Sequence, residues 1–151
     1  MADEDYIRQL EAQISARHSE HVQQTERENR EAALLKEAAP KEWIKLKDWL
    51  RDTITQVNQG NPIPHLTYED GDHIDESKIL YRIGNVRNEL RVTLLKMLGY
   101  PITVRMGEKL AFEFNPIVHG RTLKWSDPTN PIGELSIDQV GKKILNSVVG
   151  Q

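Results

Sequence analysis

The N-terminal part of the chain has residues that favour a helix but almost nothing for that helix to bury. Between Ser15 and Glu31, Val22 is the only large apolar residue, and this stretch contains neither Gly nor Pro. It is rich in Glu, Gln and Arg, which favour helix. An isolated helix gains little stability in water without tertiary packing. We therefore predict a protruding helix over residues 4–38 that packs on another chain, with partial disorder as the alternative.

A short apolar stripe occurs near the start of this predicted helix, and a second apolar patch lies near its end. The stripe has heptad spacing, but the next two positions of the same heptad pattern are occupied by the polar residues Arg17 and His21. It therefore falls short of the three or four heptads that are typical of a coiled coil. Trp49, at the flank of the next predicted helix, is a third candidate contact. The candidate self-association residues are Ile7, Leu10, Ile14, Leu34, Leu35 and Trp49.

The polar arm explains part of the low apolar fraction, which is 38% of the chain, whereas roughly 45–50% is usual in globular domains on a slightly different count. Pro40 suits the first turn of a new helix, because its missing N–H would be unpaired there in any case. We therefore divide the chain into an extended polar helical arm, residues 1–39, and a compact α+β domain, residues 40–151.

Apolar periodicity predicts the elements of the compact domain. Spacings of three and four indicate helices over residues 40–58, 75–98 and 136–149, the last started by a capping box of Ser136 and Gln139. Alternating apolar residues indicate a three-stranded antiparallel β-meander over residues 102–125, whose first loop pairs Met106 with Leu110. The predicted fold class is α+β and helix-rich, with the helices packed on this meander.

Gly84 and Asn85 interrupt the helical pattern of residues 75–98, so that one long helix and a helix-turn-helix are both compatible with it. With a break, the order of elements resembles a winged-helix domain. The matching segments are Trp43–Val57, His65–Tyr68, Asp75–Ile83, Val86–Leu98 and the hairpin Ile102–Phe114. The resemblance implies nucleic-acid binding through Arg82, Arg87, Asn88, Arg91, Arg105 and Lys109.

Charge is distributed unevenly along the sequence. The net charge is -3, from 20 basic and 23 acidic side chains. Residues 78–125 hold 9 basic and 3 acidic side chains, whereas residues 61–77 hold 5 acidic ones and no basic one. Two interpretations remain open. Acidic segments of the same chain, or of a second copy, neutralise the basic block, or an anionic partner such as nucleic acid binds it.

Several classes of site and location are disfavoured by the sequence. The chain has no Cys, which excludes disulfides and Cys-ligated metals. It lacks a phosphate-binding Gly-rich loop and the common hydrolase, zinc-protease and dinucleotide motifs. We predict no metal site and no cofactor. No long apolar run is present and the N-terminus is acidic, so we expect neither a membrane span nor a signal peptide, and a cytoplasmic location.

These features favour a non-catalytic interaction or scaffold protein that self-associates through its N-terminal helix. We expect a homo-oligomer, with a dimer favoured, and a different protein as the other candidate partner. The first alternative is a winged-helix-like nucleic-acid-binding protein. The second is an enzyme whose class these motifs do not reveal.

Overall fold

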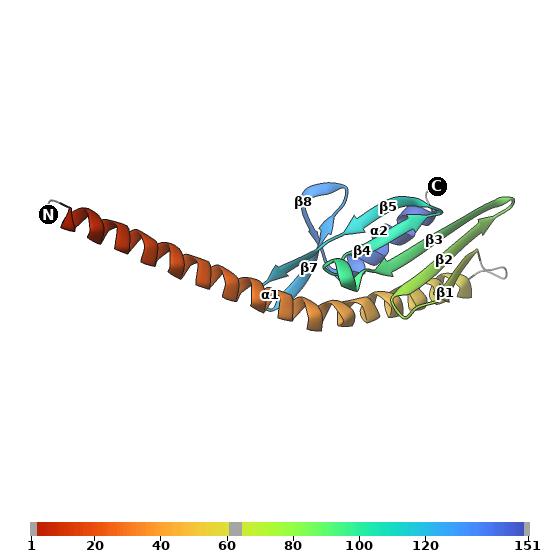
Figure 1. Cartoon of the computed structure of the whole chain (residues 1–151). Helices are drawn as coiled ribbons and strands as arrows, with labels where there is room; N and C mark the ends of the chain where they lie inside the picture. The colour runs from red at the N-terminus through yellow and green to blue at the C-terminus, as the bar shows by residue number, and fades with distance from the viewer. Residues whose placement is uncertain (1–2, 61–64, 150–151) are drawn as a thin grey trace. The chain divides into compact units, whose positions relative to one another are not determined.

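The computed structural model describes residues 3–60 and 65–149 (Figure 1). The chain divides into two compact units, Met1–Leu34 and Leu35–Gln151, and each is described by itself. The first unit is formed by the beginning of helix α1, Glu4–Gln59. The second unit contains the remainder of α1, two antiparallel sheets and helix α2, Ile137–Val149.

Helix α1 is continuous through Pro40, so the predicted division into helices 4–38 and 40–58 is wrong. A proline inside a helix removes one backbone hydrogen bond and strains the preceding turn. Burial on the C-terminal side compensates for this cost. One face of α1 is buried there, formed by Ala39, Trp43, Leu46, Leu50 and Ile54.

The larger sheet has five strands in sequential order, and it overturns the predicted helix at 75–98. Its strands are β1 Leu66–Asp70, β2 Glu76–Ile83, β3 Val86–Leu94, β4 Ile102–Met106 and β5 Lys109–Phe114. Ile83 pairs with Val86, so Gly84 and Asn85 form a two-residue hairpin turn. Gly84 has a φ of 58°, and glycine with positive φ at the first turn position is typical of a type II′ hairpin. Because Glu76–Ile83 and Val86–Leu94 are strands, this segment does not form the recognition helix that the winged-helix resemblance requires.

The smaller sheet overturns the predicted three-stranded meander over 102–125. Its strands are β6 Pro116–His119, β7 Thr122–Asp127 and β8 Asn130–Leu135, and β6 belongs to this sheet rather than to that of β4 and β5. The β4–β5 register also differs from the prediction, because Met106 pairs with Lys109 rather than with Leu110. A bulge in this ladder then realigns the strands, so that Val104 pairs with Phe112 on the apolar face.

One face of the larger sheet lies on the core and the other faces solvent. The core-facing side, the inner face, carries Leu66, Ile79, Leu90, Val92, Leu94, Ile102, Val104 and Phe114, which form one buried cluster with residues of α1 and α2. Figure 1 shows α2 behind β4 and β5. The C-terminal helix agrees with the predicted segment 136–149. The Ser136 amide donates to Gln139 Oε1 at 2.9 Å, which is one half of a capping box, whereas the Ser136 hydroxyl donates to Asp138 at 2.6 Å.

Asp127 links the β7–β8 turn to α2. It accepts hydrogen bonds from the hydroxyl and the backbone N–H of Thr129, at 2.7 and 2.9 Å, and lies 3.1 Å from Lys143 Nζ. The Thr129 hydrogen bonds, aided by Lys143, hold the pKa of Asp127 below its usual value.

This contact gives a pH prediction. Because the folded-state pKa is lowered, the contact stabilises the turn above the ordinary Asp range and is lost as the pH falls through the lowered value. An NMR titration of the Asp127 carboxyl should give a midpoint below that of a free Asp. In a Thr129→Ala variant the midpoint should rise, and an unchanged midpoint would contradict this role of Thr129.

Candidate functional site

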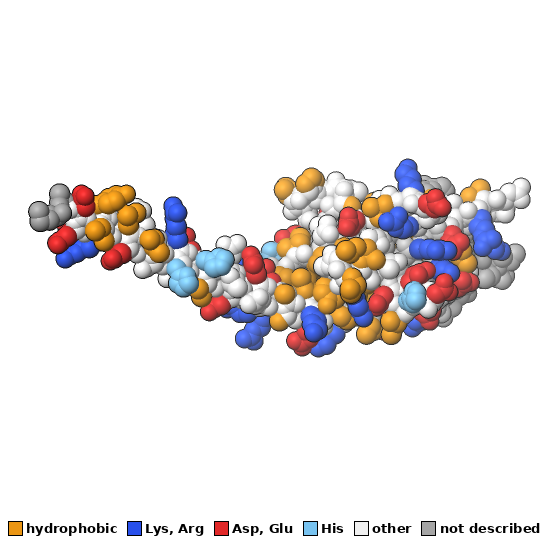
Figure 2. All heavy atoms as spheres, viewed as in Figure 1, with side chains coloured by type: hydrophobic (Ala, Val, Ile, Leu, Met, Phe, Trp, Pro, Cys, Tyr) orange, Lys and Arg blue, Asp and Glu red, His pale blue; other side chains and the backbone are white. Residues whose placement is uncertain are grey.

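The predicted apolar stripe on the first unit is exposed. Ile7, Leu10 and Ile14 have 51, 38 and 65% of their surface accessible. Every described residue from 3 to 33 is exposed. Tyr6, which the sequence analysis missed, is also exposed and lies beside the stripe. Figure 2 shows these hydrophobic side chains gathered near the N-terminal end of α1.

The other candidate self-association residues are placed differently. Leu35 and Trp49 pack against the core of the second unit, and Leu34 is half-buried. The Trp49 ring lies on α2 at Gly141, where a Cβ atom would overlap it. These contacts within the chain account for the burial of Leu35 and Trp49, so Ile7, Leu10 and Ile14 are the exposed ones among the six candidates.

The outer face of the larger sheet gathers most of the predicted nucleic-acid residues. Arg82, Arg87, Arg91 and Arg105 all lie on this solvent-facing side and are exposed. Lys78, which the sequence analysis missed, shares the face and pairs with Arg91. We call these five residues the cationic face. Figure 2 looks onto it and shows Lys and Arg side chains over β2, β3 and β4, with acidic ones among them.

Residues of like charge stand directly opposite one another on the cationic face. Arg82 pairs with Arg87 across β2 and β3, and Arg91 lies between Lys78 and Arg105 across three strands. Like charges directly opposite in a sheet are destabilising. Among the described residues, none of the five forms a side-chain ion pair within 4.0 Å, although Glu69 is the cross-strand neighbour of Lys78.

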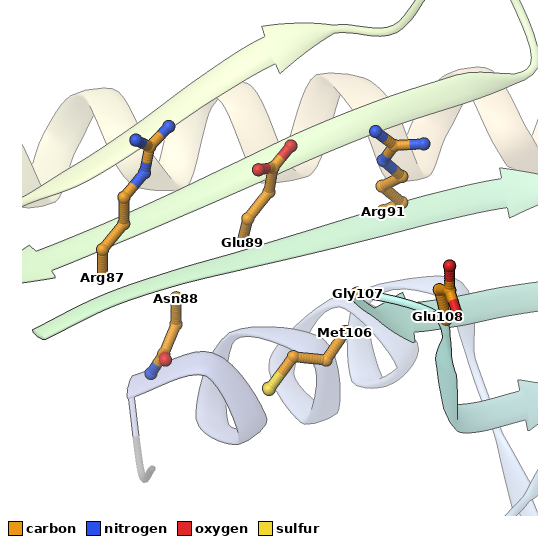
Figure 3. A pocket seen from close by; sticks show the side chains of 7 residues that line it. All are labelled: Arg87, Asn88, Glu89, Arg91, Met106, Gly107 and Glu108. Atoms are coloured by element: carbon orange, nitrogen blue, oxygen red, sulfur yellow. The ribbon is translucent and has the colours of Figure 1, made fainter.

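A pocket of about 490 Å³ lies at the edge of this face (Figure 3). It forms because β4 ends at Met106, opposite Leu90, while β3 begins four residues earlier at Val86. Figure 3 shows Arg87, Glu89 and Arg91 pointing to one side of β3. Its lining has guanidinium and carboxylate groups but no hydroxyl, thiol or imidazole. The two guanidinium groups of the lining, Arg87 and Arg91, are balanced by the two carboxylates, Glu89 and Glu108.

Two predicted residues fall away from the cationic face. Asn88 points to the other side of β3, the side on which the Met106 side chain also lies, and its side-chain nitrogen is buried with no hydrogen-bond partner among the described residues. Lys109 pairs with Met106 at the β4–β5 turn. A strand sends alternate residues to opposite faces, so Arg87 and Arg91 share a face that Asn88 cannot reach.

The acidic segment before β2 is partly neutralised within the second unit. Asp70 lies 3.5 Å from Arg51 and 3.9 Å from Lys47, both on α1, and Asp75 lies 3.3 Å from Lys96. None of these partners belongs to the cationic face. Within the described residues, no group of three His, Asp or Glu side chains is arranged to hold a metal ion.

A second basic groove, of about 430 Å³, lies between α1 and β7. It is lined by four cations, Lys41, Lys45, Arg121 and Lys124, together with Ala38, Glu42, Thr122 and Leu123. Lys41 already pairs with Glu37 at 3.4 Å. The groove contains a carboxylate and is separate from the cationic face, which makes it a useful control for tests of that face.

Comparisons with protein-family models, with curated proteins and with solved structures give no match. In the part of the chain that the structure describes, no helix is both long enough and apolar enough to span a bilayer.

Proposed function

We propose that this protein is a non-catalytic interaction protein that self-associates as a dimer through its N-terminal helix. The supporting observation is the exposed stripe of Ile7, Leu10 and Ile14 on a helix whose residues from 4 to 33 are all exposed. Full burial of one Leu or Ile side chain contributes about 1.5–3 kcal/mol. Pairing of two stripes removes several such side chains from water.

Charge complementarity favours an antiparallel pair of two copies. In an antiparallel pair of identical helices, positions at the same height have residue numbers with a constant sum. When Ile7 of one copy packs beside Ile14 of the other, Glu4 therefore lies near Arg17 and Asp3 lies near His18. A parallel pair would instead bring Glu4 against Glu4 and Arg17 against Arg17. Opposite charges on adjacent helices set their orientation, so the antiparallel arrangement is the one we propose.

Light scattering and sedimentation of the full chain test this proposal through Leu10→Glu. The substitution places a charge on each stripe, and two such losses of about 1.5 kcal/mol weaken the dimer roughly 100-fold. Ala12→Glu is the matched control, because it adds the same charge to the opposite side of the helix. The control should dimerise like the parent chain. A monomeric parent chain, or equal weakening by both variants, would refute the proposal.

A further inference from the structure

We propose that the cationic face binds double-stranded nucleic acid through the phosphates on either side of a groove. This inference is independent of the self-association proposed above. It starts from the like-charge neighbours Arg82–Arg87, Lys78–Arg91 and Arg91–Arg105, which have no ion-pair partner among the described residues. Such an arrangement costs stability unless anions lie between the cations, and phosphate groups supply them.

The cations form two rows whose spacing suits a duplex. One row contains Lys78, Arg91 and Arg105, with Glu69 beside Lys78 at its end, and the other contains Arg82 and Arg87. The rows are four residues apart along the strands, which is about 13 Å. This separation is close to the ~12 Å width of the major groove of B-DNA. One row therefore reaches the phosphates on one side of the groove while the other row reaches those on the opposite side.

The row between them has no cation. It contains Leu80 and Glu89, which are cross-strand neighbours. In the proposed complex this row lies over the groove, where no phosphate is present, so the Glu89 carboxylate does not oppose a phosphate. On β2 and β3 the cations therefore lie on either side of a row that lacks them.

The positions of the exposed apolar residues separate nucleic acid from a membrane as the partner. Firm attachment to an anionic membrane surface adds burial of apolar side chains to the attraction between cations and lipid headgroups, so it is favoured where apolar side chains lie beside the cations. Ile83 and Val86 are exposed at the tip of the β2–β3 hairpin. By strand alternation they belong to the inner face, whereas Arg82 and Arg87 belong to the cationic face.

Fluorescence anisotropy of a fluorescein-labelled DNA duplex of mixed sequence, titrated with the full chain, tests the proposal. Binding should weaken as salt is raised. The double variant Arg87→Gln/Arg91→Gln removes two phosphate contacts and should lower the slope of log K against log salt by about 1.8. At 0.1 M salt each lost contact removes a factor of about eight, so affinity should fall about 60-fold.

The double variant Lys45→Gln/Arg121→Gln is the matched control, because it removes the same charge from the second basic groove. It should bind the duplex within about twofold of the parent chain, since it leaves the phosphate contacts in place. The thermal midpoint of Arg87→Gln/Arg91→Gln should equal or exceed that of the parent chain, because three like-charge contacts are relieved. This measurement shows that any loss of binding does not come from unfolding.

Four results would overturn the proposal: no binding to the duplex at low salt, equal losses in the two double variants, unchanged binding by a folded Arg87→Gln/Arg91→Gln, or a preference for phosphatidylserine vesicles over the duplex that this variant abolishes. The expected combination is a selective loss in the sheet variant with the fold retained.

Discussion

Mild oxidation of the double variant Glu4→Cys/Arg17→Cys should join two chains covalently, whereas neither single variant should cross-link. In the proposed antiparallel pair, the side chains at positions 4 and 17 of different copies lie side by side, and equal positions lie far apart. The natural chain has no cysteine, so every thiol is an introduced one. Non-reducing electrophoresis before and after addition of a reductant measures the product.

The geometry of one helix makes this result specific. Positions 4 and 17 on the same helix are 13 residues apart, or about 20 Å along the axis, and a disulfide needs Cα atoms within about 7 Å. The double variant therefore cannot close on itself while helical. Cross-linking of both single variants would indicate a parallel pair. Failure of the double variant to cross-link at concentrations where the parent chain is dimeric would contradict the antiparallel arrangement.

Replacement of Trp125 or Trp43 by Ala should lower the free energy of unfolding by about 3–5 kcal/mol. Both side chains are almost completely buried, Trp125 on the smaller sheet and Trp43 on α1. Each fills a large volume in the single core cluster of the second unit. Urea unfolding, followed by circular dichroism, measures the effect. A loss under about 1 kcal/mol at either site would contradict its place in the core.

The corresponding Phe variants should separate the two tryptophans. Trp43 Nε1 donates to the Ile74 carbonyl at 3.1 Å, whereas Trp125 Nε1 is buried without a partner among the described residues. Trp43→Phe loses a hydrogen bond, but Trp125→Phe removes an unpaired donor from the core. A buried unpaired polar group costs about 1–3 kcal/mol, so Trp125→Phe should be the more stable variant by about that amount. The opposite order would contradict this hydrogen-bond assignment.

The main failure of sequence-based prediction was the segment 75–98, and its spacing explains why. Ile79 and Ile83 are four residues apart, as are Val86, Leu90 and Leu94. A spacing of four puts residues on one side of a helix and on one face of a strand. The pattern therefore marked Ile79, Leu90 and Leu94, which are buried, but it missed buried Val92 and did not define which element carries these residues. Gly84 was recognised as a break, but its meaning as a hairpin turn depends on two strands pairing around it.

The same ambiguity explains why the structure brings some of the predicted nucleic-acid residues together and not others. Arg87 and Arg91 share a side in a helix and in a strand, so the helical prediction groups them as the strand does, although the helix itself is wrong. Asn88 distinguishes a helix from a strand. It would adjoin Arg87 on a helix surface, but on a strand it lies on the face opposite to that of Arg87. Lys78 and the rows of like charge could not be identified, since they depend on cross-strand register.

The sequence by itself determined the features that depend on local composition and periodicity. These are the polar helix with its short stripe of Ile7, Leu10 and Ile14, and the C-terminal helix with its Ser136 cap. Tertiary structure alone decided the strand pairing of residues 75–98, the bulge that places Val104 opposite Phe112, and the continuity of α1 through Pro40. The physical reason is that pairing partners, register and burial are contributed by residues far away in the sequence, whereas helix propensity and capping are contributed by neighbours.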